Sequence, residues 1–257
     1  MKKVRNSNGP GAVRGFLEGA VFLAVLIGIW EISVDLFEVK AYLLPPPSAI
    51  AAELWVSRGE LFEHGMITMG EVLWGFLLAV GLGIPVAATI YFSSFAKRTL
   101  YPLMVALQSI PKIGLAPIIV VWFGYGLSSK VVMAFLFAFF PVVISTLGGL
   151  ASTPANMEEH FRALRASALQ TFWRLRVPAA MPSFVDGCKV AMPLAVIGAI
   201  VGEFVGSNDG LGNLILLATG SSNTPLTFAA LLTVTILSLG LFYIVEILGR
   251  FVWWRST

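Results

Sequence analysis

The chain has 257 residues, of which 57% are hydrophobic and only 12% charged, with a formal net charge of +3. Average soluble domains carry roughly 25% charged residues, so this composition excludes a disordered chain, a nucleic-acid-binding module and an ordinary water-soluble enzyme. The single cysteine, Cys188, excludes an intrachain disulfide and a thiolate metal cluster, and His64 and His160 match no zinc motif. We therefore expect a polytopic membrane protein with no metal site and no catalytic residues.

Hydropathy predicts six membrane spans within one transmembrane domain, 16–250. A bilayer core about 30 Å thick needs roughly 20 apolar helical residues. The windows that meet this length are 16–37, 66–92, 100–123, 129–150, 184–205 and 226–250, flanked by predicted tails over 1–15 and 251–257. The first window is too long for a signal peptide and lacks a small-residue cleavage site, so we interpret it as an anchor.

The positively charged residues are distributed unevenly between the two sides of the membrane. With the N-terminus in the cytoplasm, three of the 17 Lys and Arg residues fall in outer loops (Lys40, Arg58 and Lys130). Two more fall within spans (Lys112 and Lys189), and the other twelve face the cytoplasm. Because Lys and Arg accumulate on the cytoplasmic side, both termini are predicted to lie inside.

The long outer stretch, 38–65, contains a proline run over 45–47. Proline cannot continue a helix, and serine is a favourable N-cap residue. Ser48 is therefore predicted to cap a short surface helix.

The long inner stretch, 151–183, which we call the inner loop, contains two helix-start patterns. Residues 156–159 (Asn-x-x-Glu) and 167–170 (Ser-x-x-Gln) each match a capping box. Pro178 cannot extend the second helix. The pattern predicts two short helices, over about 157–164 and 168–177.

Both of these helices are amphipathic. Phe161 and Leu164 share one face of the first helix, and Phe172 lies among the apolar residues of the second. Four arginines form a basic rim: Arg162, Arg165, Arg174 and Arg176. Such a pair can lie on anionic lipid, or it can dock into a groove of a soluble protein with its apolar face inward.

Several of these residues resemble the EAA loop of binding-protein-dependent ABC importer permeases. The matching residues are Glu159, Ala163, Leu164, Ala166, Ser167, Phe172, Arg174 and the run from Pro178 to Pro182. Four further stretches resemble the nitrate/sulfonate/taurine branch of that family, namely 43–48, 75–85, 116–124 and 206–212. The resemblance thus extends from about residue 43 to 215.

The resemblance implies an all-α integral membrane protein with about six transmembrane helices and a cytoplasmic helical coupling loop over 151–183, similar to a type I ABC importer permease. It assigns ATPase coupling to Glu159, Phe161, Leu164, Arg165, Ala166, Ser167 and Phe172. His160 and Phe161 replace two alanines of the family pattern, and Arg165 replaces a glycine. Because arginine adopts a positive φ less readily than glycine, we predict a different turn between the two helices.

The resemblance also implies partners for this chain. A cytoplasmic ABC ATPase in two copies uses ATP and Mg, and a periplasmic or lipid-anchored binding protein delivers a small solute at a bacterial cytoplasmic (inner) membrane. The branch handles small oxyanions, organosulfonates and vitamin-precursor-like molecules. The sequence contains no G-x-x-x-x-G-K-[ST], so we expect no cofactor bound by this chain and an ATPase on another polypeptide. Six spans form a thin wall for a gated path, so we expect a homodimer around a two-fold axis.

Polar residues inside the predicted spans are candidates for lining the transport path. Gln108, Ser109 and Lys112 interrupt the third window beside Pro111. A helix break in the membrane frees backbone groups that protein or water must satisfy, which favours a cavity-lining position. Glu203, near the outer end of the fifth window, fits a solvated carboxylate as well as a pathway residue.

Two other polar features have structural explanations. Asp186 and Lys189 are three residues apart and can pair along one helix face. Glu31 lies deep in the first window, where we expect a hydrogen bond to a neighbouring helix near Ser33 or Thr68.

Gly198, Gly202 and Gly206 form a stripe of small residues on one face of the fifth window. Such a stripe allows two helices to approach closely in lipid. The partner helix can belong to the same chain or to a second copy around the central pathway.

Two other functional classes compete with an importer permease. An ion-gradient-driven secondary carrier is the alternative, with Glu31 or Glu203 as a proton-coupled carboxylate. Such carriers commonly show two related halves, but residues 1–128 do not resemble 129–257. A membrane enzyme ranks third, because the sequence has neither His-Glu-x-x-His nor Gly-x-Ser-x-Gly.

Overall fold

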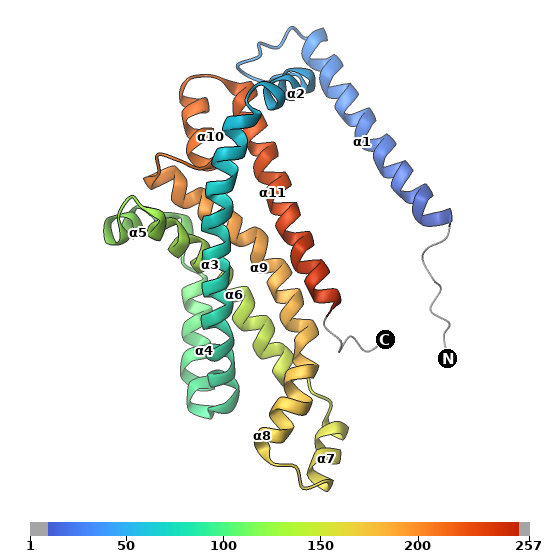
Figure 1. Ribbon diagram of the computed structural model, residues 1–257, viewed down its shortest axis with the longest axis vertical. Helices are drawn as coiled ribbons and strands as arrows, with labels where there is room; N and C mark the ends of the chain where they lie inside the picture. The colour runs from blue at the N-terminus through green and yellow to red at the C-terminus, as the bar shows by residue number, and fades with distance from the viewer. Residues whose placement is uncertain (1–9, 252–257) are drawn as a thin grey trace.

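The computed structural model describes residues 10–251, which form helices and turns without a strand (Figure 1). The long helices are α1 (Pro10–Leu36), α3 (Arg58–Phe92), α6 (Leu127–Ala151), α9 (Val177–Gly206) and α11 (Thr224–Arg250). The shorter ones are α2 (Pro47–Val56), α4 (Ser94–Gln108), η1 (Lys112–Leu115), α5 (Ala116–Phe123), α7 (Ala155–Ala163), α8 (Ala168–Thr171), η2 (Phe172–Arg176) and α10 (Leu211–Gly220). The all-α prediction is confirmed.

The predicted tails fall largely outside this range. Residues 1–9 and 252–257 lie outside the described residues. The remainder of the predicted N-terminal tail, 10–15, is helical, because α1 begins at Pro10.

Within residues 10–251, five helical segments are long and apolar enough to cross a membrane. A sixth crossing requires α4 and α5 together, and these two helices are bent by 87° at the break that separates them. The predicted third span, 100–123, is therefore not one straight helix. Pro111 lies in the break and has no backbone N–H to continue the α4 hydrogen-bond ladder.

Helix α6 occupies the centre of the bundle. It packs extensively against α9 and α3. Small, fully buried residues line this contact, among them Ala79, Ala134, Ala138 and Ala195. Small side chains let helix backbones approach closely, which favours association in lipid, where apolar side chains gain little from meeting one another.

The predicted glycine stripe lies in the contact between α9 and its neighbours in the same chain. A Cβ atom on Gly198 would lie 2.6 Å from the carbonyl oxygen of Met133 in α6. On Gly202 it would lie 3.1 Å from a backbone atom one turn earlier in α6, and on Gly206 it would lie 2.6 Å from the Val120 side chain. Of the two alternatives, the structure places the stripe in intrachain packing.

Helix α1 stands apart from the bundle and joins it near α2 (Figure 1). The Glu31 carboxylate accepts hydrogen bonds from the Ser48 hydroxyl at 2.5 Å and the Ser48 amide at 3.0 Å. The expected partner near Ser33 or Thr68 is wrong, because α1 diverges from α3, which carries Thr68. Ser48 is also not the N-cap of α2, since that helix already begins at Pro47.

An ionic cluster joins α9 to α11. Lys189 pairs with Asp186 at 3.2 Å, which confirms the predicted pair. Lys189 also pairs with Glu246 of α11, which in turn lies 3.5 Å from Arg250. The two helices are thus tied by charge as well as by packing.

Candidate functional site

The inner loop forms a helical hairpin at one end of the bundle, opposite α2 and α10 (Figure 1). Helix α7 spans 155–163, close to the predicted 157–164. The chain then reverses at Arg165 and continues as α8.

One of the two predicted capping boxes exists. The Ser167 hydroxyl accepts a hydrogen bond from the Gln170 amide at 3.2 Å, and the Gln170 side chain accepts one from the Ser167 amide at 2.9 Å. Asn156 does not cap α7, because Pro154 occupies the N-cap position. Proline holds the backbone there in an extended conformation, so the helix begins earlier than the sequence pattern indicates.

The second helix of the hairpin does not end at Pro178, in contrast to the prediction. Helices α8, η2 and α9 form one continuous segment, Ala168–Gly206. In η2, a π-helical turn, the Val177 amide bonds to the Phe172 carbonyl five residues back. This wider turn accommodates the ring of Pro178 without breaking the helix. The hairpin is therefore joined directly to the span α9.

The turn at Arg165 differs from our expectation. Arg165 adopts φ +52°, the left-handed conformation that glycine would adopt, so the turn is not altered by the arginine. Its amide bonds to the Arg162 carbonyl at 2.9 Å, and the Ala166 amide bonds to the Phe161 carbonyl at 3.0 Å. These two bonds form a Schellman motif, which stabilises the turn despite the strain at Arg165.

Replacing Arg165 by glycine is expected to stabilise this turn by about 1 kcal/mol, because glycine avoids the steric cost of the left-handed conformation. Hydrogen exchange at the Ala166 amide measures the local free energy of opening. Arg165→Ala is the matched control, since alanine retains the Cβ atom and its strain. Equal protection in the glycine and alanine variants would contradict the prediction.

The residues predicted to contact an ATPase lie at this end of the molecule with different exposures. Glu159, Leu164, Arg165 and Ser167 are exposed, whereas Phe161, Ala166 and Phe172 are partly buried. The ring of Phe172 packs against Phe92 at the end of α3, with ring centroids 4.9 Å apart. Two further apolar side chains, Leu169 and Trp173, are also largely exposed on the hairpin.

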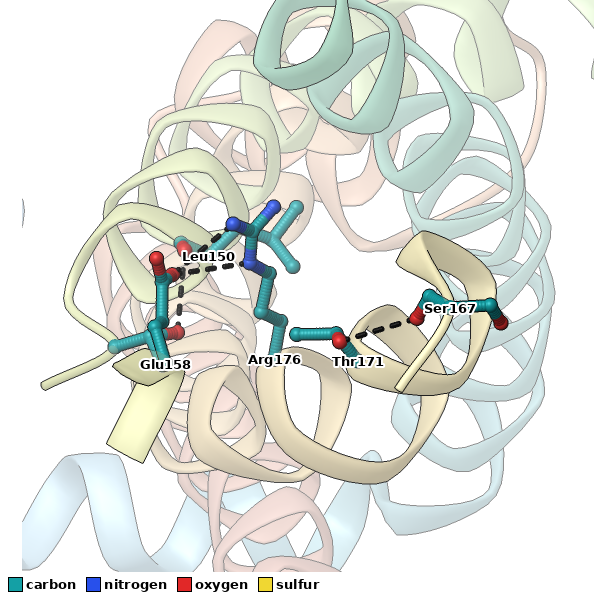
Figure 2. A network of polar contacts seen from close by, with 6 residues as sticks. Leu150, Glu158, Ser167, Thr171 and Arg176 are labelled. Carbon is teal, nitrogen blue, oxygen red and sulfur yellow. Dashed lines mark hydrogen bonds and ion pairs between the residues drawn. The ribbon is translucent and has the colours of Figure 1, made fainter. Parts of the chain in front are cut away.

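Sequence reasoning missed an ion pair inside the hairpin. The Nε and Nη2 atoms of Arg176 each lie 3.1 Å from Oε1 of Glu158 (Figure 2). The Arg176 guanidinium also lies 5.1 Å from the centre of the Tyr91 ring in α3. The sequence placed Arg176 on an outer rim. The signal that could have indicated otherwise is Glu158, directly before the predicted coupling residue Glu159, because adjacent helical residues point in different directions.

Three of the predicted pathway residues lie together at the break between α4 and α5. The Lys112 ammonium donates to the Gln108 carbonyl at 3.3 Å and lies 5.2 Å from the centre of the Phe140 ring. The Ser109 hydroxyl donates to the Val105 carbonyl at 3.2 Å. Gln108 and Ser109 are exposed, so the break presents polar groups on the surface of the single chain.

Glu203 lies in a separate cluster at the other end of the bundle. Its side chain is buried, with the residue only 1% exposed, so it is not a solvated carboxylate. It accepts hydrogen bonds from the Thr68 hydroxyl at 2.6 Å and from the Gly212 amide. The Thr68 hydroxyl also accepts from the Leu211 amide at 2.9 Å. Glu203 thus fastens the start of α10 to α9 and α3.

Other polar groups surround this cluster. Glu71 is also buried in α3, one turn after Thr68, and His64 Nδ1 accepts from the Gly210 amide at 2.9 Å. Lys130, which we predicted in an outer loop, is buried in the first turn of α6 and donates to the Tyr125 carbonyl at 2.8 Å. The contacts of Glu203 with Thr68 and of His64 with Gly210 could not be inferred from sequence spacing, because they join residues far apart in the chain.

Comparison with known proteins gives three findings. A family model described as "Binding-protein-dependent transport system inner membrane component" matches residues 79–254. The chain is 40% identical to the formylaminopyrimidine transport permease protein ThiX of Halalkalibacterium halodurans, over 87% of this chain and 89% of that protein. It is 34% identical to the putative aliphatic sulfonates transport permease protein SsuC of Bacillus subtilis, over 87% of this chain and 82% of that protein.

Among solved structures, the chain shares its fold with a chain of the MetNI methionine ABC transporter in an inward-facing conformation. The TM-score is 0.63 at 21% sequence identity, and the match covers 77% of this chain and 97% of that chain.

Proposed function

Because the chain belongs to the family of inner-membrane components of binding-protein-dependent transport systems, it is the membrane-spanning permease subunit of an ABC importer, and we propose that its inner loop couples a separate ATPase to the membrane helices. The family assignment confirms the resemblance seen in the sequence, including the sulfonate branch, and favours an importer over an ion-gradient-driven carrier. An importer of this kind works with an ATPase and a substrate-binding protein.

The observation that carries the coupling proposal is the direct continuity of the inner loop with a span. Helices α8, η2 and α9 form one segment, so a force applied to the hairpin reaches the centre of the membrane without an intervening linker. The exposed apolar side chains Leu164 and Leu169, with Glu159 nearby, provide a surface that fits a groove on a soluble protein. On this proposal two ATPase copies use ATP and Mg, and the permease binds no cofactor and hydrolyses no ATP.

We further propose that the inner loop and both termini lie in the cytoplasm of a bacterium and that the chain resides in its inner membrane. The start of α1 and the end of α11 point away from α2 and α10, as the inner loop does, which supports this orientation (Figure 1). Helices α2 and α10 then face a periplasmic or lipid-anchored binding protein. Exposed apolar side chains on α1 and α5 favour contact with membrane lipid and with a second copy in a homodimer.

The transported solute is proposed to be a small organic molecule or oxyanion. Gln108, Ser109 and Lys112 are the proposed lining residues, because the break between α4 and α5 presents them together on the surface. We propose that Glu203 does not line the path but anchors the outer end of the helix bundle, since it is buried and hydrogen-bonded within the chain.

Reversing the charge of Glu159 tests the coupling proposal. We expect Glu159→Lys to weaken association with the co-expressed ATPase about tenfold or more, because a like charge placed at an interface costs several kcal/mol. Co-purification with the tagged permease measures this, together with ATP-dependent uptake. Glu60→Lys is the control, because Glu60 is exposed in the first turn of α3 at the opposite end.

Unchanged co-purification and uptake in Glu159→Lys would reject the coupling role of this residue. Uptake by proteoliposomes that contain no ATPase and are driven by a pH gradient would instead favour the carrier. A hairpin that binds anionic vesicles but not the ATPase would support the alternative in which it lies on lipid.

A further inference from the structure

Helix α7 is held in place by few contacts. None of its residues is buried, and among the described residues no other helix packs extensively against it. It is bounded by Pro154 on one side and by the Schellman turn at Arg165 on the other. Its orientation relative to the membrane helices therefore depends strongly on individual side-chain contacts.

The Glu158–Arg176 ion pair is the main side-chain contact of this kind. Figure 2 shows the two side chains pointing toward one another. Both side chains are about three-quarters covered, with 24% and 25% exposed. The pair joins α7 to the last residue of η2, directly before α9.

The same guanidinium also reaches α3. It faces the ring of Tyr91, and the adjacent Phe92 packs against Phe172 at the start of η2. The last turn of α3 therefore contacts both ends of η2. Through Arg176, three elements meet at one side chain: α7, the η2–α9 segment and α3.

From this junction we infer that Arg176 is a positioning residue that transmits movement of α7 to the span α3 as well as to α9. The inference rests on the proposed function, in which an ATPase grips the hairpin. Partly exposed ion pairs and cation–π contacts are individually weak. Arg176 can therefore set the orientation of α7 without contributing much to folding or to ATPase docking, and its loss should affect transmission rather than assembly.

The test measures the distance between α7 and α3 in the complex with the co-expressed ATPase. Spin labels are attached at Met157→Cys on α7 and Phe95→Cys beside the end of α3, both exposed positions, in a Cys188→Ala background. Double electron–electron resonance is recorded without nucleotide and with ATP and vanadate. With Arg176 present we expect one narrow distribution that ATP leaves unchanged, because the two helices move together.

Arg176→Gln is expected to broaden this distribution and to make it shift with ATP, while ATPase co-purification stays unchanged. Glu158→Gln should act in the same way, and Arg176→Lys should restore a narrow distribution because it keeps a positive charge opposite Glu158. Tyr91→Phe keeps the ring and should resemble the wild type, whereas Tyr91→Leu should resemble Arg176→Gln.

The proposed function and the transmission role of Arg176 are overturned by different results. If the ATPase does not co-purify with the wild-type chain, the proposed function is wrong. If it co-purifies with every variant and the distribution in Arg176→Gln matches the wild type with and without ATP, the transmission role of Arg176 is overturned.

Discussion

Adding a single methyl group at Gly198 is expected to destabilise the protein by about 3 kcal/mol, the upper part of the range for overpacked cores. A Cβ atom there would lie 2.6 Å from the Met133 carbonyl oxygen and 2.8 Å from the Ala134 Cα atom. Both are backbone atoms of α6, so no side-chain rotation can relieve the contact. For a chain of this size, Gly198→Ala should lower the thermal unfolding midpoint in detergent by about 6–12 °C.

Gly240→Ala is the matched control for this substitution. Gly240 also lies in a long apolar helix, α11, but no atom of another helix lies within 4 Å of the Cβ position there. Alanine has a higher helix propensity than glycine, so the midpoint should stay constant or rise slightly. A similar fall of the unfolding midpoint in both variants would mean that the close approach of α9 to α6 is not what makes glycine necessary at position 198.

The glycine stripe illustrates what the sequence could predict. A bilayer sets the length of an apolar helix, and a four-residue repeat of glycine places small residues on one face. The number of apolar segments and the hairpin between the fourth and fifth therefore follow from local patterns. The capping box at Ser167 is predicted equally well, because its partners lie within one turn.

The parts that the sequence could not predict depend on contacts between elements. Glu31 bonds to Ser48 because α1 diverges from the bundle, and nothing in the spacing of these residues indicates that direction. The π-helical turn that carries the chain past Pro178 is likewise not indicated by any local pattern, and Pro111 predicts a break between α4 and α5 but not its angle of 87°. At Arg165, the hydrogen bonds of the Schellman turn outweigh the backbone preference on which our prediction relied.

Removing the carboxylate of Glu203 is expected to destabilise the outer end of the bundle by about 3 kcal/mol, because each buried polar group left without a partner costs about 1–3 kcal/mol. Glu203→Ala leaves the Gly212 amide without its acceptor and removes one of the two acceptors of the Thr68 hydroxyl, which also contacts the His64 carbonyl and in turn holds the Leu211 amide. Thermal unfolding should show a lower midpoint. Hydrogen exchange should be faster at Leu211 and Gly212 than in the centre of α9.

Two further variants identify the cause of this loss. Glu203→Gln keeps a carbonyl oxygen that can accept from the Gly212 amide, so it should retain more stability than the alanine variant. Glu60→Ala removes an exposed carboxylate from the first turn of α3 and should change stability by no more than about 0.5 kcal/mol. If the alanine and glutamine variants at position 203 have the same stability and the same hydrogen exchange at Gly212 as the wild type, the carboxylate does not anchor α10. That result would instead favour a role for Glu203 in the transport path.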